Sequence, residues 1–169
     1  MPDNPHDPSL EDLLAQLRFA LSEPVNFRNT DPATTQAKVR LLTAAATYFN
    51  LLALTDFGGR VDPAREAGLV EQVVAAAFQT YGGYDPHHGP FAKAAMLLRG
   101  ITPGHPFHDA NKRTGFLTAA YSLELMGSPL PDDFATGEME TLAMRVSAGE
   151  LRDLDAIAQE LRRLWGGTV

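Results

Sequence analysis

The chain contains no cysteine, and this absence excludes several kinds of chemistry. Without thiols there is no disulfide, no thiolate-held metal and no cysteine nucleophile, and a reducing compartment suits the chain. The sequence also lacks an apolar run long enough to cross a bilayer, and it shows no basic-then-apolar leader. We therefore expect a cytoplasmic protein without membrane contact.

Positive charge is also in short supply. The 14 Lys and Arg residues are outnumbered by 21 Asp and Glu, which leaves a formal net charge of −7. Most nucleic-acid-binding proteins present a basic surface, so we expect no direct nucleic-acid contact. The acidic excess is explained most simply by solubility, and a basic partner segment is the alternative.

A length of 169 residues, 44% of them hydrophobic, suits a single domain with a real core. Apolar residues recur at helical spacing, and no alternating strand exceeds a few residues. We predict an all-α fold with helices over about 33–54, 63–81, 91–99, 109–127, 131–147 and 150–165.

Residues 1–32 are expected to form an N-terminal extension, and residues 33–169 the main domain. Ser9 can cap a short helix in the extension, and four leucines lie on one face of it. This face offers a route to self-association, so an oligomer is left open. The leucines are Leu10, Leu13, Leu14 and Leu17.

The segment from His105 to Thr114 carries the densest collection of reactive side chains, directly before a helical pattern. A helix N-terminus presents unpaired N–H groups and partial positive charge, which suit phosphate oxygens. Asn111, Lys112 and Arg113 fall in the first turn, where cations are unfavourable unless an anion completes the site. The segment therefore predicts a site for a nucleoside triphosphate.

Three further residues of this segment fit the same chemistry. Asp109 can cap the helix and can also ligate Mg²⁺, which usually rides on nucleotide phosphates. His105 precedes the helix and can take a proton from an attacking hydroxyl. Phe107 is expected to point inward and fix the loop. Each residue alone has an ordinary structural explanation, and their clustering favours the functional one.

The segment resembles the Fic/Doc (Fido) family, whose pattern is His-x-Phe-x-Asp/Glu-Gly/Ala-Asn-Gly/Lys-Arg. Every defining position matches, and the resemblance extends from about residue 57 to residue 165. Most members transfer AMP and carry Gly where this chain has Lys112 and a second Arg where it has Phe116. Lys without the second Arg resembles the Doc (death-on-curing) branch.

The resemblance implies a single-domain helical bundle with the motif loop at a helix N-terminus and a short β-hairpin flap that aligns the target peptide. The irregular stretch 79–88, rich in Gly and Pro, lies where we expect this flap. The implied activity is that of a toxin that moves the γ-phosphate of ATP to a hydroxyl of elongation factor Tu and stops translation.

The resemblance also implies a role for each motif residue. His105 would be the base, Asp109 would hold Mg²⁺, and Phe107 would anchor the loop. The phosphates would be bound by Asn111, Lys112 and Arg113, with Ala110 allowing close approach of the backbone.

Control is expected to come from a separate antitoxin. Self-inhibited members carry Ser/Thr-x-x-x-Glu-Gly/Asn, and the nearest match here, Thr136 to Glu140, is followed by Thr141. We therefore predict no self-inhibition.

Three other functions stay open at this point. AMP transfer could use the same residues, because nucleotide orientation depends on the shape of the pocket. A catalytically silent nucleotide-binding module could retain the motif. His108 and Asp109 also form the dipeptide of HD-type metal phosphohydrolases, which would need further ligands such as His87 and His88.

Overall fold

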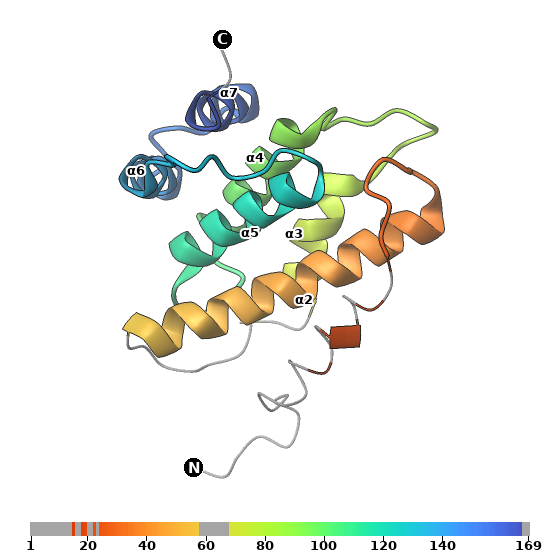
Figure 1. Ribbon diagram of the computed structural model, residues 1–169, viewed down its shortest axis with the longest axis horizontal. Helices are drawn as coiled ribbons and strands as arrows, with labels where there is room; N and C mark the ends of the chain where they lie inside the picture. Colours follow the sequence, from red (N-terminus) through yellow and green to blue (C-terminus); the bar gives the residue numbers. More distant parts are fainter. Residues whose placement is uncertain (1–14, 16–17, 20–21, 23, 58–67, 167–169) are drawn as a thin grey trace.

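The computed structural model describes residues 15, 18–19, 22, 24–57 and 68–166, and its helices form a layered bundle (Figure 1). The helices bounded within these residues are α2 (Pro32–Phe57), α3 (Leu69–Phe78), α4 (Pro90–Ile101), α5 (Asn111–Leu125), α6 (Thr136–Ser147) and α7 (Leu154–Leu164). The prediction of an all-α fold is confirmed, since every regular element in the described part of the chain is a helix. None of these helices is both long and apolar enough to span a membrane.

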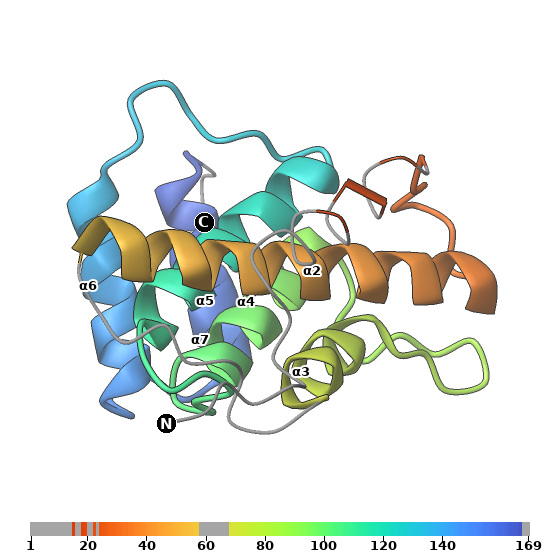
Figure 2. The ribbon, with the colours of Figure 1, turned by 90° about the horizontal axis from the view of Figure 1, so that it is seen from below.

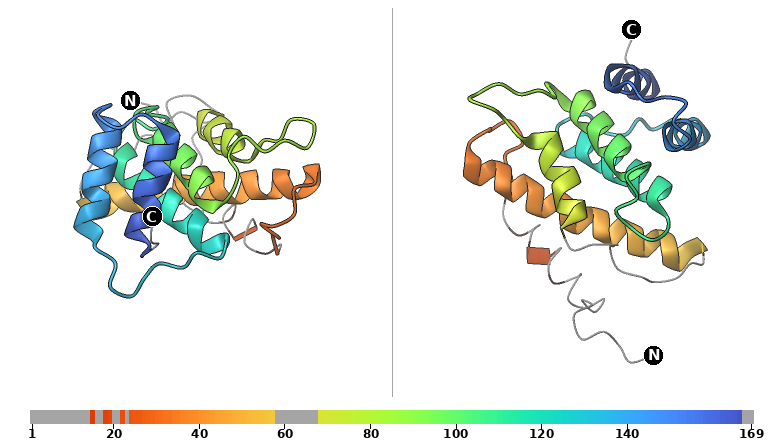
Figure 3. Two further views of the ribbon diagram at one scale, coloured as in Figure 1. Left: turned by 90° about the horizontal axis from the view of Figure 1, so that it is seen from above. Right: turned by 180° about the vertical axis from the view of Figure 1, so that it is seen from behind.

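Helix α4 lies at the centre of the bundle, and α5 packs between it and α2. Figures 2 and 3 show α2 along one side and the α6–α7 pair on the other, with α3, α4 and α5 between them. The inward residues of α4 are almost fully buried: Ala94, Ala95, Leu97, Leu98 and Ile101. This packing joins the end of α4 to the start of α5, where the motif lies.

Local sequence signals explain where several helices begin and end. The Asp31 carboxylate caps α2 by accepting from the Thr34 amide at 2.9 Å and from its hydroxyl at 2.6 Å. The Asp153 carboxylate caps α7 by accepting from the Ala156 amide at 2.9 Å. Gly127, with φ 87°, follows α5 in the left-handed conformation that glycine favours at a helix end.

The expected bounds of α2 and α4 are close to those observed, and the other four helices are shorter than predicted, α5 by two residues at each end. Gly68 has φ 87°, so α3 begins only at Leu69. A turn in which the Phe134 amide donates to the Pro131 carbonyl delays α6. Gly149 (φ 73°) and the Asp153 cap similarly delay α7. The short helix of the extension and the first turn expected at Pro63 lie mainly or wholly outside the described residues.

The expected hairpin flap is present as a single β-bridge. Tyr81 and Tyr84 exchange two backbone hydrogen bonds of 2.8 and 3.0 Å around Gly82 and Gly83, which both have positive φ. However, the bridge precedes α4, whereas the motif follows it, and a helix of 12 residues spans about 18 Å. Helix α4 therefore separates the hairpin from the motif along the chain (Figures 1 and 2), and the role of this hairpin in aligning a target peptide stays a prediction.

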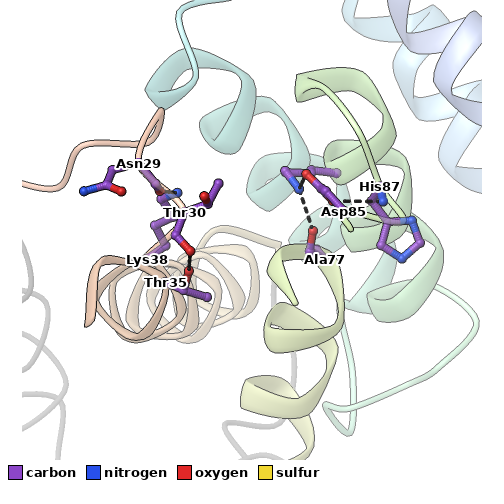
Figure 4. A network of polar contacts seen from close by, with 8 residues as sticks. Asn29, Thr30, Thr35, Lys38, Ala77, Asp85 and His87 are labelled. Carbon is purple, nitrogen blue, oxygen red and sulfur yellow. Dashed lines mark hydrogen bonds and ion pairs between the residues drawn. The ribbon is translucent and has the colours of Figure 1, made fainter. Parts of the chain in front are cut away.

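A polar cluster stabilises the end of the bundle that carries the hairpin (Figure 4). The Lys93 ammonium lies 2.7 Å from an Asp85 carboxylate oxygen, and the buried Lys38 ammonium donates to the Asn29 carbonyl. Both ammonium groups lie within 6 Å of the Phe78 ring, at 5.9 and 5.4 Å. Burial and then the charge of Lys93 lower the pKa of Lys38. The cluster ties the loop before α2 and the base of the hairpin to the core.

Candidate active site

The motif loop turns sharply off the end of α4. The Thr102 amide donates to the Leu98 carbonyl at 3.0 Å, and the His105 amide donates to the Ile101 carbonyl at 3.2 Å. A Cβ at Gly104 would lie 1.9 Å from the Gly100 carbonyl oxygen, so this turn requires glycine. The loop is thereby folded tightly against α4.

Phe107 holds the middle of the loop in the core. Its side chain is 2% exposed and belongs to a cluster with Ala46, Val70 and Ile101. The cluster joins three helices, so the loop is anchored to α2, α3 and α4 together. Such burial is what an anchoring residue requires.

The Asn111 side chain holds the same loop from its other end. It is 5% exposed, and its Oδ1 accepts from the Phe107 amide at 3.0 Å while its Nδ2 donates to the Phe107 carbonyl at 2.9 Å. A buried amide with both partners supplied by the loop acts as a positioning group. Phosphate binding by Asn111 therefore stays a prediction for its backbone amide rather than for its side chain.

Helix α5 begins without a side-chain cap among the described residues. Its N-cap is Ala110, with φ 58° and ψ 16°, and not Asp109 as the sequence suggested. Asp109 lies one residue earlier, and its Oδ1 accepts from the Ala110 amide at 2.5 Å. The first-turn N–H groups of α5 are thus left for a ligand, as an anion site at a helix end requires.

Four functional side chains of the motif lie on the surface around this helix end. His105, Asp109, Lys112 and Arg113 are all exposed, in contrast to Phe107. The Arg113 Nη1 donates to the Ala53 carbonyl at 3.3 Å, near the end of α2 where the helix dipole is negative. The loop therefore combines an anchored backbone with solvent-facing reactive groups.

A cavity of about 410 Å³ opens next to the two cations, between α5 and α6. It is lined by Lys112, Arg113, Phe116, Leu117, Thr136, Glu140, Ala143 and Met144. Its size falls in the range of small-molecule sites, and its wall is mainly apolar with cations at one edge. A nucleotide, which joins an apolar ring to anionic phosphates, has this distribution of chemistry.

Aromatic packing supports one wall of the cavity. The Phe116 and Phe134 rings are stacked with centroids 6.5 Å apart, and Trp165 meets Phe134 edge-on at 4.8 Å. The Trp165 indole N–H donates to the Ser128 carbonyl at 3.2 Å. The end of α7 thus stiffens the connection that leads from α5 to α6.

Comparison with known proteins supports one family. The model of the Fic/DOC family matches residues 40–123, which include the motif loop. Toxin Doc of Mycolicibacterium smegmatis is 36% identical over 105 residues, which cover 62% of this chain and 79% of that protein. Protein kinase doc of Escherichia phage P1 is 31% identical over 108 residues, with 64% and 79% covered. A Fido domain-containing protein of Dictyostelium discoideum is 37% identical over 65 residues, with 37% and 46% covered.

This chain belongs to the Fic/Doc family, in its Doc toxin branch. It is accordingly a nucleotide-dependent transferase of the Doc type. The matched residues begin within α2 and end within α5, so the α6 wall of the cavity lies beyond the family match.

The Doc-type site contains one residue that the sequence reading missed. Asn50, on α2, is 4% exposed and contacts the motif loop. It lies on the same helical face as Ala46 and Ala53, where the sequence pattern is otherwise apolar. An isolated amide on a predicted core face was the signal that could have identified it.

The HD-type alternative is not supported by the arrangement of the histidines. His87 precedes α4 and His108 follows it, so the length of that helix separates them. No group of three or more His, Asp or Glu side chains suited to a metal occurs in the described part of this Doc-branch chain.

Proposed function

We propose that this chain is a Doc-like toxin that transfers the γ-phosphate of ATP to a hydroxyl of a target protein and thereby inhibits translation. Elongation factor Tu is the target that the family resemblance implies, and that target places the toxin in the cytoplasm. One observation carries the proposal. A base, a carboxylate and two cations surround the uncapped start of α5, directly beside a cavity of nucleotide size.

In this proposal the phosphates lie at the start of α5. Its first-turn N–H groups point at an anion, and Lys112 and Arg113 add a point charge and a bidentate fork. Both side chains also line the cavity, where Phe116 and Met144 offer apolar surface to the nucleoside. Phosphoryl transfer depends mainly on positioning and charge neutralisation, and these residues supply both.

Asp109 would hold the Mg²⁺ that accompanies ATP. Mg²⁺ on a nucleotide typically takes only one or two protein carboxylates, so a single exposed Asp beside the phosphate site fits it. When bound, the metal neutralises phosphate charge and orients the phosphate chain.

In this proposal His105 would act as the base. In the proposed step its ring takes the proton of the target hydroxyl while that oxygen bonds to the γ-phosphorus. The bond from the γ-phosphorus to the bridging oxygen breaks, and ADP leaves. The exposed position of His105, outside the cavity lining, suits contact with a protein substrate rather than with the nucleoside.

We expect a separate antitoxin, as toxin relatives imply, and no self-inhibition. The structure makes the second point testable, because Thr136 and Glu140 line the same cavity as Lys112. If the chain is not self-inhibited, Glu140→Ala will leave the activity of the isolated toxin unchanged or lower it. A large rise in activity would instead identify Glu140 as an internal brake.

Labelled nucleotides test the proposal. The chain is incubated with a bacterial lysate and ATP labelled at either the α- or the γ-phosphate, and His105→Ala is the control. Protein label from the γ-position alone, absent with the variant, is the expected result. Label from the α-position would identify AMP transfer, and no label with bound ATP would identify a silent binding module.

A further inference from the structure

Asn50 connects α2 to the motif loop across more than fifty residues of sequence. Its Nδ2 donates to the Asp109 carbonyl at 2.8 Å and to the Thr114 hydroxyl at 3.1 Å. Thr114 is fully buried in the first turns of α5. One amide therefore ties three segments together, namely α2, the end of the motif loop and the start of α5.

The place of this amide in the core requires an explanation. Ala46, Ala53 and Leu54 on the same helix are buried and apolar. A buried polar group is costly unless it is hydrogen-bonded, and a leucine would fill such a position at lower cost. Both N–H groups of Asn50 are nevertheless directed at the motif segment.

The bond to the Asp109 carbonyl acts at one of the two points of the loop where a non-glycine residue has a positive φ, the other being His105 with φ 46°. That carbonyl belongs to the peptide that enters Ala110, a non-glycine residue in the left-handed region with φ 58°. Such a conformation persists only where the surroundings determine it. The orientation of this peptide sets the direction of the first N–H groups of α5 and of the Asp109 side chain. Asn50 therefore controls the orientation of the first N–H groups of α5 and of the Asp109 side chain, although its own side chain faces the protein interior.

We propose that Asn50 is a positioning residue of the active site, which holds the Asp109–Ala110 peptide in the orientation needed for the metal and the phosphates. It acts together with Asn111, which holds the other side of the loop at Phe107. The effect of Asn50 on catalysis rests on the proposed function. Its effect on the geometry of the loop does not depend on any ligand.

The first test measures the loop in the full-length chain without nucleotide. Backbone amide hydrogen exchange of residues 107–111 is compared between the wild type and Asn50→Leu, which removes both bonds at similar volume. We expect exchange in these residues to accelerate at least about tenfold, because the segment opens more readily once the Asp109 carbonyl loses a buried hydrogen bond. Thr114→Val is the matched control, because it removes the bond to the hydroxyl but keeps the bond to the Asp109 carbonyl, and it should leave exchange within about twofold of the wild type.

The second test measures the catalytic consequence. With Mg²⁺ and ATP, Asn50→Leu should lower kcat and raise the Mg²⁺ concentration for half-maximal activity, each by about tenfold or more, while the fraction of folded protein stays unchanged. Thr43→Val is a second control, since the Thr43 hydroxyl is buried on the same helix without a hydrogen-bond partner in the described residues. This control should leave kcat and the Mg²⁺ requirement unchanged.

The outcomes separate this inference from the proposed function. A faster-exchanging loop in Asn50→Leu, in a chain whose wild type transfers no label, would support the positioning role and refute the kinase. Unchanged exchange and activity in Asn50→Leu would overturn the positioning role alone. If Asn50→Leu does not fold, the rate of solvent exchange of the Asn50 side-chain N–H groups is measured by NMR in the wild type. Exchange much slower than that of an exposed asparagine would support the inference, and equally fast exchange would overturn it.

Discussion

Replacing Asn111 with alanine tests whether the motif loop is held as the structure indicates. The substitution removes two buried hydrogen bonds, of 3.0 and 2.9 Å, that connect the Asn111 amide to the Phe107 backbone. It leaves the Phe107 amide and carbonyl without these partners next to a side chain that is 2% exposed. The loss should therefore appear in stability as well as in activity.

The magnitude follows from the two groups that lose their partners. Each buried, unsatisfied backbone group costs about 1–3 kcal/mol, and alanine returns about 0.5 kcal/mol through its better helix propensity. Asn111→Ala should therefore lower the free energy of unfolding by about 2–5 kcal/mol. Activity should fall further than the folded fraction does, because the loop also carries His105 and Asp109.

Urea unfolding followed by circular dichroism measures the loss, and Asn26→Ala is the matched control. The Asn26 side chain accepts one exposed hydrogen bond, from the Arg28 amide at 3.0 Å, so its removal should change stability by less than about 0.5 kcal/mol. An Asn111→Ala chain as stable as this control would show that the two buried bonds do not stabilise the loop.

Three other predictions concern the loop, the cation and the far end of the bundle. Ala110→Gly should raise the free energy of unfolding by about 0.5–1 kcal/mol in urea melts, because glycine relieves the left-handed φ of 58°, and a decrease would contradict this. Lys112→Met should raise the KM for ATP and lower kcat while stability stays within about 0.5 kcal/mol, and unchanged kinetics would remove Lys112 from the phosphate site. Burial raises the pKa of Asp85, but the hydrogen bond from Lys93 and further contacts outweigh burial and hold this pKa below its usual value. The Asp85 carboxylate therefore stabilises the fold above the unfolded pKa of about 3.9, and this stability is lost as pH falls through the lower folded pKa. Thermal melts across that pH window should therefore show a steeper acid loss in the wild type than in Asp85→Asn, and identical profiles would contradict the ion pair.

The fold could be predicted where local signals act alone. Helices α2 and α4 follow from apolar periodicity, and the observed bounds are close to the expected ones. The starts of α6 and α7 could not be placed, because a turn at Pro131 and a cap at Asp153 override the apolar pattern. The hairpin lies within the stretch 79–88 expected for it, as a single bridge between Tyr81 and Tyr84.

The sequence predicts which residues form the site better than it predicts their geometry. The sequence identifies the motif residues from His105 to Arg113 because their types and spacing are distinctive. It does not show that the Asn111 side chain is used by the Phe107 backbone, or that Ala110 rather than Asp109 caps α5. Asn50 and the α6 wall of the cavity are brought in by tertiary packing from distant parts of the chain, and no local pattern specifies that contact.

Transfer of the γ-phosphate to a target protein is tested most directly by the mass of purified elongation factor Tu after incubation with the chain, ATP and Mg²⁺. We expect the addition of one phosphoryl group to a hydroxyl side chain, which is absent with His105→Ala and removable by a phosphatase. Addition of an adenylyl group, or the same phosphorylation by His105→Ala, would contradict it.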